Sequence, residues 1–450
     1  MSPVWRKAMV LAAAAYTFAH VVASGIVFPL RTPNVGQVIE ELQPITRQIL
    51  FGVATVDHPR QYGPVFLLLL DPVYRFSVDN PAALALYCYL LDVIAIGVGF
   101  YATVLAIQSW LASRGTIMSG PLLFGLAVLW GNFGPLYGVL AIKNVELWEL
   151  AFIMVGCAAA LRGRRWVVAW AIAAAALTKM LPFVFVPYLL LRDRRTFAYT
   201  LVAMFAILSL SQLVYGSEMG WGYFPSLVRA ATGAQGYGNA VSLTWHENIS
   251  IRGLMMKAFG YLEHPSRQIM NQLYSRGYYV VVSPEMRPWA IRIGAAAQGA
   301  GMLWVAWTLW RRRLVTEPAR TFWDWALVGA MMLVLAPQIS QDYMVLTLGA
   351  FSAVLAGCVM YGGAVNWAAF GIGTLLVGNV LPRGLFSQLV LIDPMIQWAG
   401  YQHLTRAEAY QYFGFPLLGL LVLVWAWTRV SEMPAHRSVE LTNPGPPAAA

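Results

Sequence analysis

Charge is scarce in this chain of 450 residues. Asp, Glu, Lys and Arg make up 11% of the sequence, whereas hydrophobic residues make up 59%. About a quarter of the residues of a soluble globular protein are charged, so the composition excludes that class. Apolar runs of 18 or more residues recur along the chain, which is typical of membrane-spanning helices. The sequence therefore predicts a polytopic membrane protein.

Cysteine and metal-binding patterns are also nearly absent. The three cysteines, Cys88, Cys157 and Cys358, all lie within apolar segments. An odd number of cysteines in such segments predicts small buried side chains without a disulfide or metal role. No Cys-His spacing indicates zinc, and no Walker-type glycine loop indicates a bound nucleotide. We therefore expect neither a metal nor a cofactor.

Alternating strand patterns are missing as well, because the apolar runs are longer than the strands of a β-barrel. Backbone groups in hydrocarbon need partners within their own segment, so helices are the expected spans. We predict an all-α fold of about 10–13 membrane helices, including short broken or re-entrant ones. Residues 1–430 form the expected transmembrane domain, and residues 431–450 form a Pro/Ala-rich, disordered cytoplasmic tail.

The basic residues lie in short loops beside the apolar runs, although the net charge is +10. This distribution follows the positive-inside rule and does not indicate a nucleic-acid partner. Arg6 and Lys7 precede a first run that is too long for a signal peptide, so the N-terminus is predicted to be cytoplasmic. The arginine groups should then share one side of the membrane. The polar loops should share the other: residues 31–64, which include a surface helix, 131–144, 215–288, 337–343 and 381–411.

The apolar segment 166–191 has basic clusters at both ends and Thr178-Lys-Met-Leu-Pro182 at its middle. A single crossing would place one of these clusters on the outer side, against the positive-inside rule. Proline also breaks helices. We therefore predict two half-length helices that enter from the cytoplasm, turn near Lys179 and return, with Lys179 facing a polar cavity. The alternative is a kinked full span with a snorkelling lysine.

The longest break between apolar segments, from about residue 215 to 289, contains a rare polar cluster: His246, Glu247, Asn248 and Arg252. Polar groups near a membrane need partners or water, so this cluster is a candidate site, with an ordinary hydrophilic loop as the alternative. Further polar residues lie in the predicted outer loops or nearby spans: Glu40, Glu41, Asp57, His58, Arg60, Glu146, Lys179, Gln341 and Asp342. Bases can hold a phosphate and a carboxylate can accept a proton, which suits chemistry on an anionic lipid carrier.

Four short motifs occur in order along the chain: Gln61-Tyr-Gly-Pro64, Ala176-Leu-Thr-Lys-Met-Leu-Pro182, Asn248-Ile-Ser-Ile-Arg-Gly253 and Leu335-Ala-Pro-Gln-Ile-Ser340. Together they resemble motifs of glycosyltransferase family 87, whose members are C-superfamily, polyprenyl-phosphate-dependent membrane transferases that include mannosyltransferases. The resemblance covers roughly residues 10–350. Three positions depart from the family pattern, and one of them is Gln341-Asp-Tyr343, which replaces His-rich positions of the late motif. No aspartate occurs early in the first outer loop, and Lys143-Asn-Val-Glu146 replaces a Gly-Gln-x-Asn element.

The resemblance implies an inverting transfer of a mannose-like or pentose sugar from polyprenyl phosphate. The acceptor would be a hydroxyl of a lipid or glycan of the cell envelope. The protein would lie in a bacterial plasma (inner) membrane, with its site facing the periplasm. The alternatives are an inactive homologue that binds lipid-linked sugar, and a transporter or flippase. A transporter would usually show interrupted helices in both halves, and the sequence shows one interrupted pair.

The resemblance also suggests roles for the candidate residues. The expected catalytic base is Asp57, followed by Glu41 and Glu40; the alternative for Asp57 is a turn residue before Pro59. Donor or phosphate contacts are expected from Lys179, His246, Arg252, Asn248, Arg60 and Tyr62. Acceptor or cavity contacts are expected from His58, Glu146, Glu247, Gln341 and Asp342.

Overall fold

The computed structural model describes residues 3–31, 62–77, 80–217, 219–223, 225, 248–263, 279–312, 318–336, 339–378, 410–411 and 413–431. Helices dominate this part of the chain, so the predicted all-α class is confirmed. One small hairpin was not predicted: strand β1 (Gly260–Glu263) pairs antiparallel with β2 (Tyr279–Val282), with Gly260 opposite Val282. Ser431 ends the last helix, and the rest of the predicted tail lies outside the described residues.

Within the described residues, four helical stretches are long and apolar enough to cross a membrane: Val4–Leu30, Ala82–Ala112, Arg194–Tyr215 and Gln341–Tyr361. A fifth candidate is a pair of helices, α7 (Gly120–Gly131) and α8 (Gly134–Ile142), bent by 45° at a short break. Shorter apolar helices accompany them, as predicted for broken and re-entrant segments. The chain is therefore a polytopic helical membrane protein.

The helices of the first half follow the predicted apolar runs closely. The first span is α1 (Pro3–His20), continued by the π-helical η1 (Val21–Val27) and by α2 (Phe28–Arg31). The helices that follow it, apart from α7 and α8, are α5 (Pro64–Ser77), α6 (Pro81–Ala112), α9 (Glu146–Leu161), α10 (Arg165–Thr178), η3 (Leu181–Val184), α11 (Phe185–Arg192) and α12 (Arg194–Tyr215). Helix α6 packs on α9, α9 on α10, and α10 on α12.

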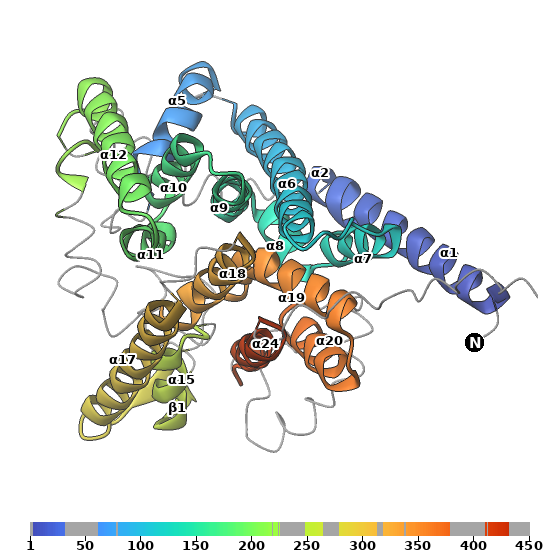
Figure 1. Cartoon of the computed structure of the whole chain (residues 1–450). Helices are drawn as coiled ribbons and strands as arrows, with labels where there is room; N and C mark the ends of the chain where they lie inside the picture. The colour runs from blue at the N-terminus through green and yellow to red at the C-terminus, as the bar shows by residue number, and fades with distance from the viewer. Residues whose placement is uncertain are drawn as a thin grey trace, which may run out of the picture.

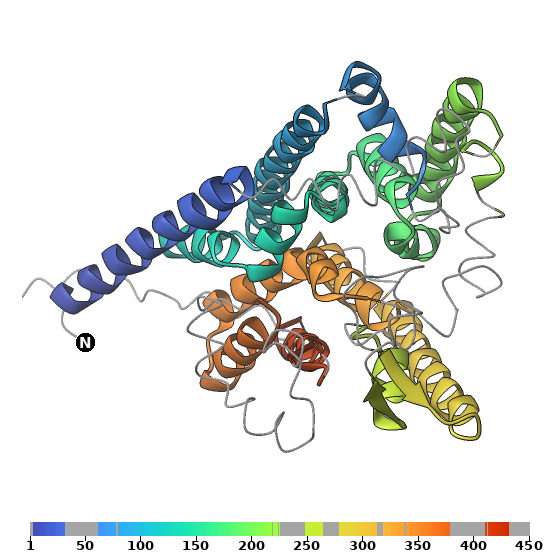
Figure 2. The same ribbon diagram turned by 180° about the vertical axis from the view of Figure 1, so that it is seen from behind.

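The second half forms a separate group of helices below the first in Figure 1. It contains α15 (Ile251–Ala258), α17 (Arg287–Arg312), α18 (Pro318–Val334), the 3-10 helix η4 (Gln341–Thr347), α19 (Leu348–Tyr361), α20 (Ala364–Gly378) and α24 (Phe415–Ser431). Helices α18, α20 and α24 pack around α19, and α15 packs on α17. The short helix η4 joins the halves, because it contacts α8, α9 and α18. Both views show α1 projecting away from the other helices (Figures 1 and 2).

Two predicted outer loops contain helices that were not predicted: residues 215–288 include α15 (Ile251–Ala258), and residues 131–144 include α8. Residues 131–144 contain helix α8 rather than an extended polar loop. Pro135 lies in the first turn of this helix, where its missing N–H costs nothing. Leu136, Val139 and Leu140 are then buried on one side of it. Apolar residues at helical spacing outweigh the Gly and Pro residues that suggested a loop.

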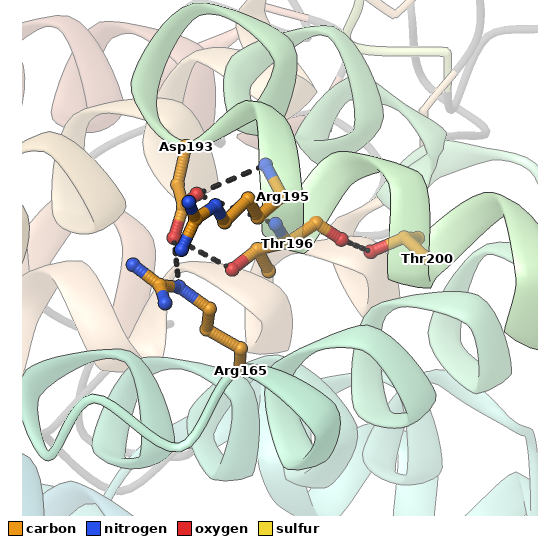
Figure 3. A network of polar contacts seen from close by, with 5 residues as sticks. All are labelled: Arg165, Asp193, Arg195, Thr196 and Thr200. Carbon is orange, nitrogen blue, oxygen red and sulfur yellow. Dashed lines mark hydrogen bonds and ion pairs between the residues drawn. The ribbon is translucent and has the colours of Figure 1, made fainter.

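The predicted re-entrant pair is confirmed by an ion pair between its two ends. Arg165 begins α10 and Asp193 directly follows α11, yet Arg165 Nε lies 2.8 Å from Asp193 Oδ2 (Figure 3). The chain therefore returns to the level at which it entered, and a kinked full span is excluded. Asp193 also caps α12, because its carboxylate accepts hydrogen bonds from the backbone N–H groups of Arg195 and Thr196. Such a cap satisfies N–H groups that a helix start leaves without partners.

Arginines from distant parts of the chain meet at one end of the bundle, here called the arginine face. Arg192 donates to the carbonyl of Arg312 at 3.3 Å, and Arg312 pairs with Asp324 at 3.2 Å. Arg162 bonds to Ser109, Arg114 to Tyr361, and Arg429 to Asn366. These arginines therefore share one end of the bundle, and most of the predicted polar loops lie outside the described residues, so the separation of arginines from polar loops stays a prediction. The cytoplasmic assignment of the arginine face stays a prediction.

Candidate functional site

Lys179 lies at the turn of the re-entrant pair, at the end opposite to the arginine face. Its backbone is extended, with φ −154° and ψ 159°, and it stops α10. Pro182 begins the next short helix, so the sequence itself prevents α10 from continuing. Lys179 forms an isolated antiparallel bridge with Tyr62, and Gly63 N–H donates to the Thr178 carbonyl at 2.8 Å. Two motifs that lie far apart in the sequence are thus joined by their backbones.

Gly63 allows this close approach of the two backbones. A Cβ atom at this position would collide with the carbonyl of Leu177 and would touch the Tyr223 hydroxyl. Any other residue would therefore push the chain away from the end of α10. Pro64 then starts α5 directly after the bridge. This contact explains each residue of the Tyr-Gly-Pro element. Tyr62 supplies an aromatic ring, Gly63 allows the close approach because it has no side chain, and Pro64 starts a helix.

The Lys179 side chain is buried in a charged and aromatic environment. Its Nζ lies 2.6 Å from Glu146 Oε1, and the two side chains are 6% and 0% exposed. The Tyr62 and Tyr343 rings face the same ammonium group, with Nζ–centroid distances of 5.1 Å and 4.4 Å. A buried ammonium group needs such partners, because its desolvation is costly. The alternative of a snorkelling lysine is therefore wrong.

Glu149 adds a second carboxylate to this environment. It is fully buried, and neither of its oxygens has a hydrogen-bond partner within the described part of the chain. It interacts electrostatically with Lys179 and Glu146. Sequence reasoning missed this residue, although its spacing of three from Glu146 places both on one side of α9. We call Tyr62, Glu146, Glu149, Lys179 and Tyr343 the Lys179 cluster.

A further layer of side chains supports the cluster from α6 and α9. The Tyr62 hydroxyl donates to Asn144 Oδ1 at 3.3 Å, in the loop before Glu146. Buried Asp92 accepts a 2.8 Å hydrogen bond from Trp148 Nε1. The Phe66 ring lies between those of Trp148 and Tyr62, with centroid distances of 6.3 Å and 4.8 Å. Asp92 therefore anchors a row of rings that ends at Lys179.

The Asn248–Gly253 motif has a clear local role. Asn248 Oδ1 accepts hydrogen bonds from Ser250 N–H at 3.0 Å and from Ile339 N–H at 3.3 Å. The Ser250 hydroxyl caps α15 by accepting from Gly253 N–H at 3.0 Å. A Cβ at residue 253 would lie 2.6 Å from the Asn248 carbonyl oxygen, so glycine is needed there. The motif fixes the start of α15 against the segment before η4.

Arg252 and Gln341 also have protein partners. Arg252 Nε donates to Gln298 Oε1 at 2.5 Å, and Gln298 Nε2 donates to the Ala336 carbonyl at 2.9 Å. Gln341 Oε1 accepts from Gln411 at 3.2 Å, and Asp342 lies in the first turn of η4. Arg252 is therefore tied to α17 in this structure, whereas Lys179 is tied to α9.

The segment from Ile339 to Tyr343 connects the two groups of residues. Ile339 is bonded to the Asn248 motif, and Tyr343 faces Lys179. Segments near residues 62, 144, 179, 248 and 340 therefore meet at one place, remote from the arginine face. The predicted surface helix at 38–50 lies outside the described residues. So do the remaining candidates, which are Glu40, Glu41, Asp57, His58, Arg60, His246 and Glu247.

The described residues also bear on metal binding. No set of three or more His, Cys, Asp or Glu residues there could hold a metal ion. Cys88, Cys157 and Cys358 are free and buried. The chemical groups available at the site are thus a buried ammonium, two carboxylates and two phenol rings.

A helical membrane bundle with a buried polar cluster at one end defines the class of protein, an integral membrane protein with an internal site. The comparison with family models identifies it further. The model described as glycosyltransferase family 87 matches residues 61–337, which is more than half of the chain. The chain therefore belongs to glycosyltransferase family 87 and is a membrane glycosyltransferase. No curated protein matches the chain. The matched range begins beside Tyr62 and contains both Lys179 and the Asn248 motif.

Proposed function

We propose that the protein transfers a sugar from a polyprenyl-phosphate donor to a hydroxyl group of a lipid or glycan acceptor, with inversion at the anomeric carbon. The observation that carries the proposal is the convergence of three separated segments, at Tyr62, Glu146 and Tyr343, on Lys179. A buried cation at the end of a re-entrant helix can receive the phosphate of a donor whose lipid chain stays in the bilayer.

In the proposed reaction, the acceptor oxygen forms a bond to the anomeric carbon. The bond from that carbon to the phosphate oxygen breaks on the opposite side, and polyprenyl phosphate leaves with the electron pair. A carboxylate takes the proton of the acceptor hydroxyl. General bases of this kind contribute about 10²–10⁴-fold to a rate.

Lys179 is the proposed contact to the phosphate. In the structure its ammonium group is paired with Glu146, with Glu149 nearby, so a cation is held in place before the donor arrives. An anionic phosphate that enters beside Tyr62 and Tyr343 can share this cation. Because the site excludes water, the attraction between phosphate and ammonium is stronger there than at a solvated surface.

Asp57 is the proposed base, with Glu41 and Glu40 as alternatives. Asp57 precedes Tyr62 by five residues, and Tyr62 is bridged to Lys179. Five residues span at most about 17 Å when extended, so the chain connection keeps Asp57 near the cluster. Arg60, His58, His246 and Glu247 belong to the same proposed surface around the donor and acceptor. We propose that this surface faces the periplasm of a bacterial inner membrane.

The test is a transfer assay with purified protein, a panel of radiolabelled polyprenyl-phosphate sugars and native lipid extract as acceptor. We expect incorporation from one donor and a loss of about 10²–10⁴-fold in Asp57→Asn. Asp79→Asn, which changes an aspartate outside the family motifs, should keep its activity and serves as the control.

Three outcomes separate the alternatives. Equal transfer by the wild type and Asp57→Asn moves the role of base to Glu41 or Glu40, which Glu41→Gln and Glu40→Gln then distinguish. If folded protein still binds lipid-linked sugar but transfers none of the donor sugars, the proposed transferase activity is contradicted and the protein is an inactive homologue. If the protein moves lipid-linked sugar across the membrane of proteoliposomes without transferring the sugar, the transferase activity is likewise contradicted and the protein is a flippase.

A further inference from the structure

A shallow pocket lies at the end of α17 remote from the arginine face. Its lining comes from the end of β2, the following turn and the first two turns of α17: Val282, Pro284, Arg287, Pro288, Ile291 and Arg292. At its other end, α17 reaches Arg312, which is fixed to Asp324 and Arg192. The helix has 26 residues and is thus about 39 Å long, more than the hydrocarbon thickness. A helix of this length that crossed the bilayer would place its first turns in the headgroup layer.

Two arginines face this pocket. Among the described residues, the side chains of Arg287 and Arg292 form no ion pair or hydrogen bond, and the Arg292 guanidinium lies 5.8 Å from the centre of the Trp289 ring. Glu285, in the preceding turn, is exposed and also unpaired within the described residues. A positive pair at this end of the helix runs against the charge bias of the rest of the chain. A ligand of opposite charge would account for it.

The surroundings of the arginines are apolar. Ile291 and Val282 pack against the small core of Met256 and Ala290. Trp289 is 55% exposed and Ile293 is 42% exposed, on the surface of α17 beside the pocket. Tryptophan is enriched at the level of lipid headgroups, with apolar side chains below it in the bilayer. The pocket therefore combines positive charge with a surface that suits acyl chains.

We propose that this pocket binds the phosphate headgroup of an anionic phospholipid of the bilayer. Arg287 and Arg292 contact the phosphate, and Val282, Pro288 and Ile291 contact the glycerol and the first acyl carbons. Guanidinium groups match phosphate oxygens in geometry as well as in charge. The proposal rests on α17 and the hairpin alone, so it does not depend on the transfer reaction.

The experiment is native mass spectrometry of the full chain in detergent, titrated with phosphatidylglycerol or with phosphatidylcholine. We expect tighter binding of phosphatidylglycerol, and a loss of about fivefold in affinity for each of Arg287→Gln and Arg292→Gln. Arg311→Gln removes a basic residue from the opposite end of the same helix and is the matched control. A loss in Arg311→Gln equal to that in the pocket variants would overturn the proposal, because it would indicate general attraction of anionic lipid.

A third variant tests the pocket apart from its charge. Ile291→Trp keeps both arginines and fills the space between them, so it should also weaken phosphatidylglycerol binding. Its thermal unfolding midpoint is measured beside that of the wild type, and Ile291→Phe, which also adds volume, repeats the test if the tryptophan variant does not fold. Undiminished binding in folded Ile291→Trp contradicts a built pocket. Displacement of the lipid by inorganic phosphate alone contradicts a lipid ligand and indicates a site for a free anion.

Discussion

At the scale of single residues, the buried Lys179–Glu146 pair distinguishes this chain from an ordinary helical bundle. The two side chains are 6% and 0% exposed and lie 2.6 Å apart. The desolvation of two charges offsets much of their attraction, so such a pair contributes little net stability. Removing one partner, however, leaves an uncompensated charge and costs about 3–5 kcal/mol. The pair is therefore better explained by a function of the cation than by stability.

This argument leads to a double-mutant cycle. Lys179→Met and Glu146→Gln should each lower the free energy of unfolding by about 3–5 kcal/mol, and the double variant by clearly less than their sum. The measurement is denaturant unfolding in detergent, followed by helical circular dichroism. Transfer activity should stay lost in the double variant, because the proposed phosphate contact is gone.

Lys257→Met is the matched control for the cycle. Lys257 is also buried, and its Nζ donates to the carbonyl of Gln411 at 3.4 Å, outside the Lys179 cluster. Its effect should add to that of Glu146→Gln without coupling. Recovery of transfer in the Lys179→Met/Glu146→Gln variant would assign Lys179 a purely structural role.

At the scale of elements, the re-entrant pair α10–α11 positions Lys179. Its two ends are joined by Arg165 and Asp193, and Asp193 also caps α12. Partial burial raises the pKa of Asp193, but hydrogen bonds from Arg165 and Thr196 outweigh it and hold that pKa below its ordinary value of 3.8. A carboxylate with a depressed pKa stabilises the fold above its ordinary pKa. This stabilisation is lost as the pH falls through the lower pKa of the folded state.

Asp193→Asn tests this contact, because asparagine keeps the cap and removes the charge. We expect a small decrease in the thermal unfolding midpoint at neutral pH, since both partners are partly exposed to solvent. The difference from the wild type should shrink as the pH is lowered below about 4. A difference that stays constant down to pH 3 would show that the carboxylate charge does not stabilise the pair.

At the scale of the whole molecule, the arginine face and the Lys179 cluster lie at opposite ends of the bundle. The arginines that mark the first face come from the ends of α6, α9, α11, α17 and α24. If the positive-inside rule holds, this face is cytoplasmic and the cluster opens toward the outer side.

Labelling of introduced cysteines checks this orientation. The three native cysteines are buried, so they should not react with the label. Ile117, 89% exposed, follows α6 at the arginine face, and Glu285 precedes α17 at the other end. A membrane-impermeant maleimide should label Glu285→Cys in spheroplasts with intact inner membranes. It should label Ile117→Cys only after permeabilisation. The reverse pattern would place the transfer site in the cytoplasm.

The sequence by itself determined the membrane class, most helix boundaries, the re-entrant pair and the grouping of the arginines. These follow from local properties: hydropathy over a window, the position of proline, and the charge bias of short loops. Glycosyltransferase family 87 was also identifiable, because its motifs are short stretches of sequence. Helix α8 was missed because its Gly and Pro residues suggested a loop, whereas burial of its apolar side decided the outcome.

Only the tertiary structure decided what the motifs do. Glu149 belongs to the Lys179 cluster because α9 faces the end of α10. Tyr343 belongs to it because η4 packs on α8 and α9. Arg252, expected at the phosphate, donates a hydrogen bond to Gln298, and its contact to the phosphate stays a prediction. Asn248 secures a loop through its hydrogen bonds to Ser250 and Ile339. Such pairings depend on contacts between residues far apart in the chain, and no local pattern of residue types contains them.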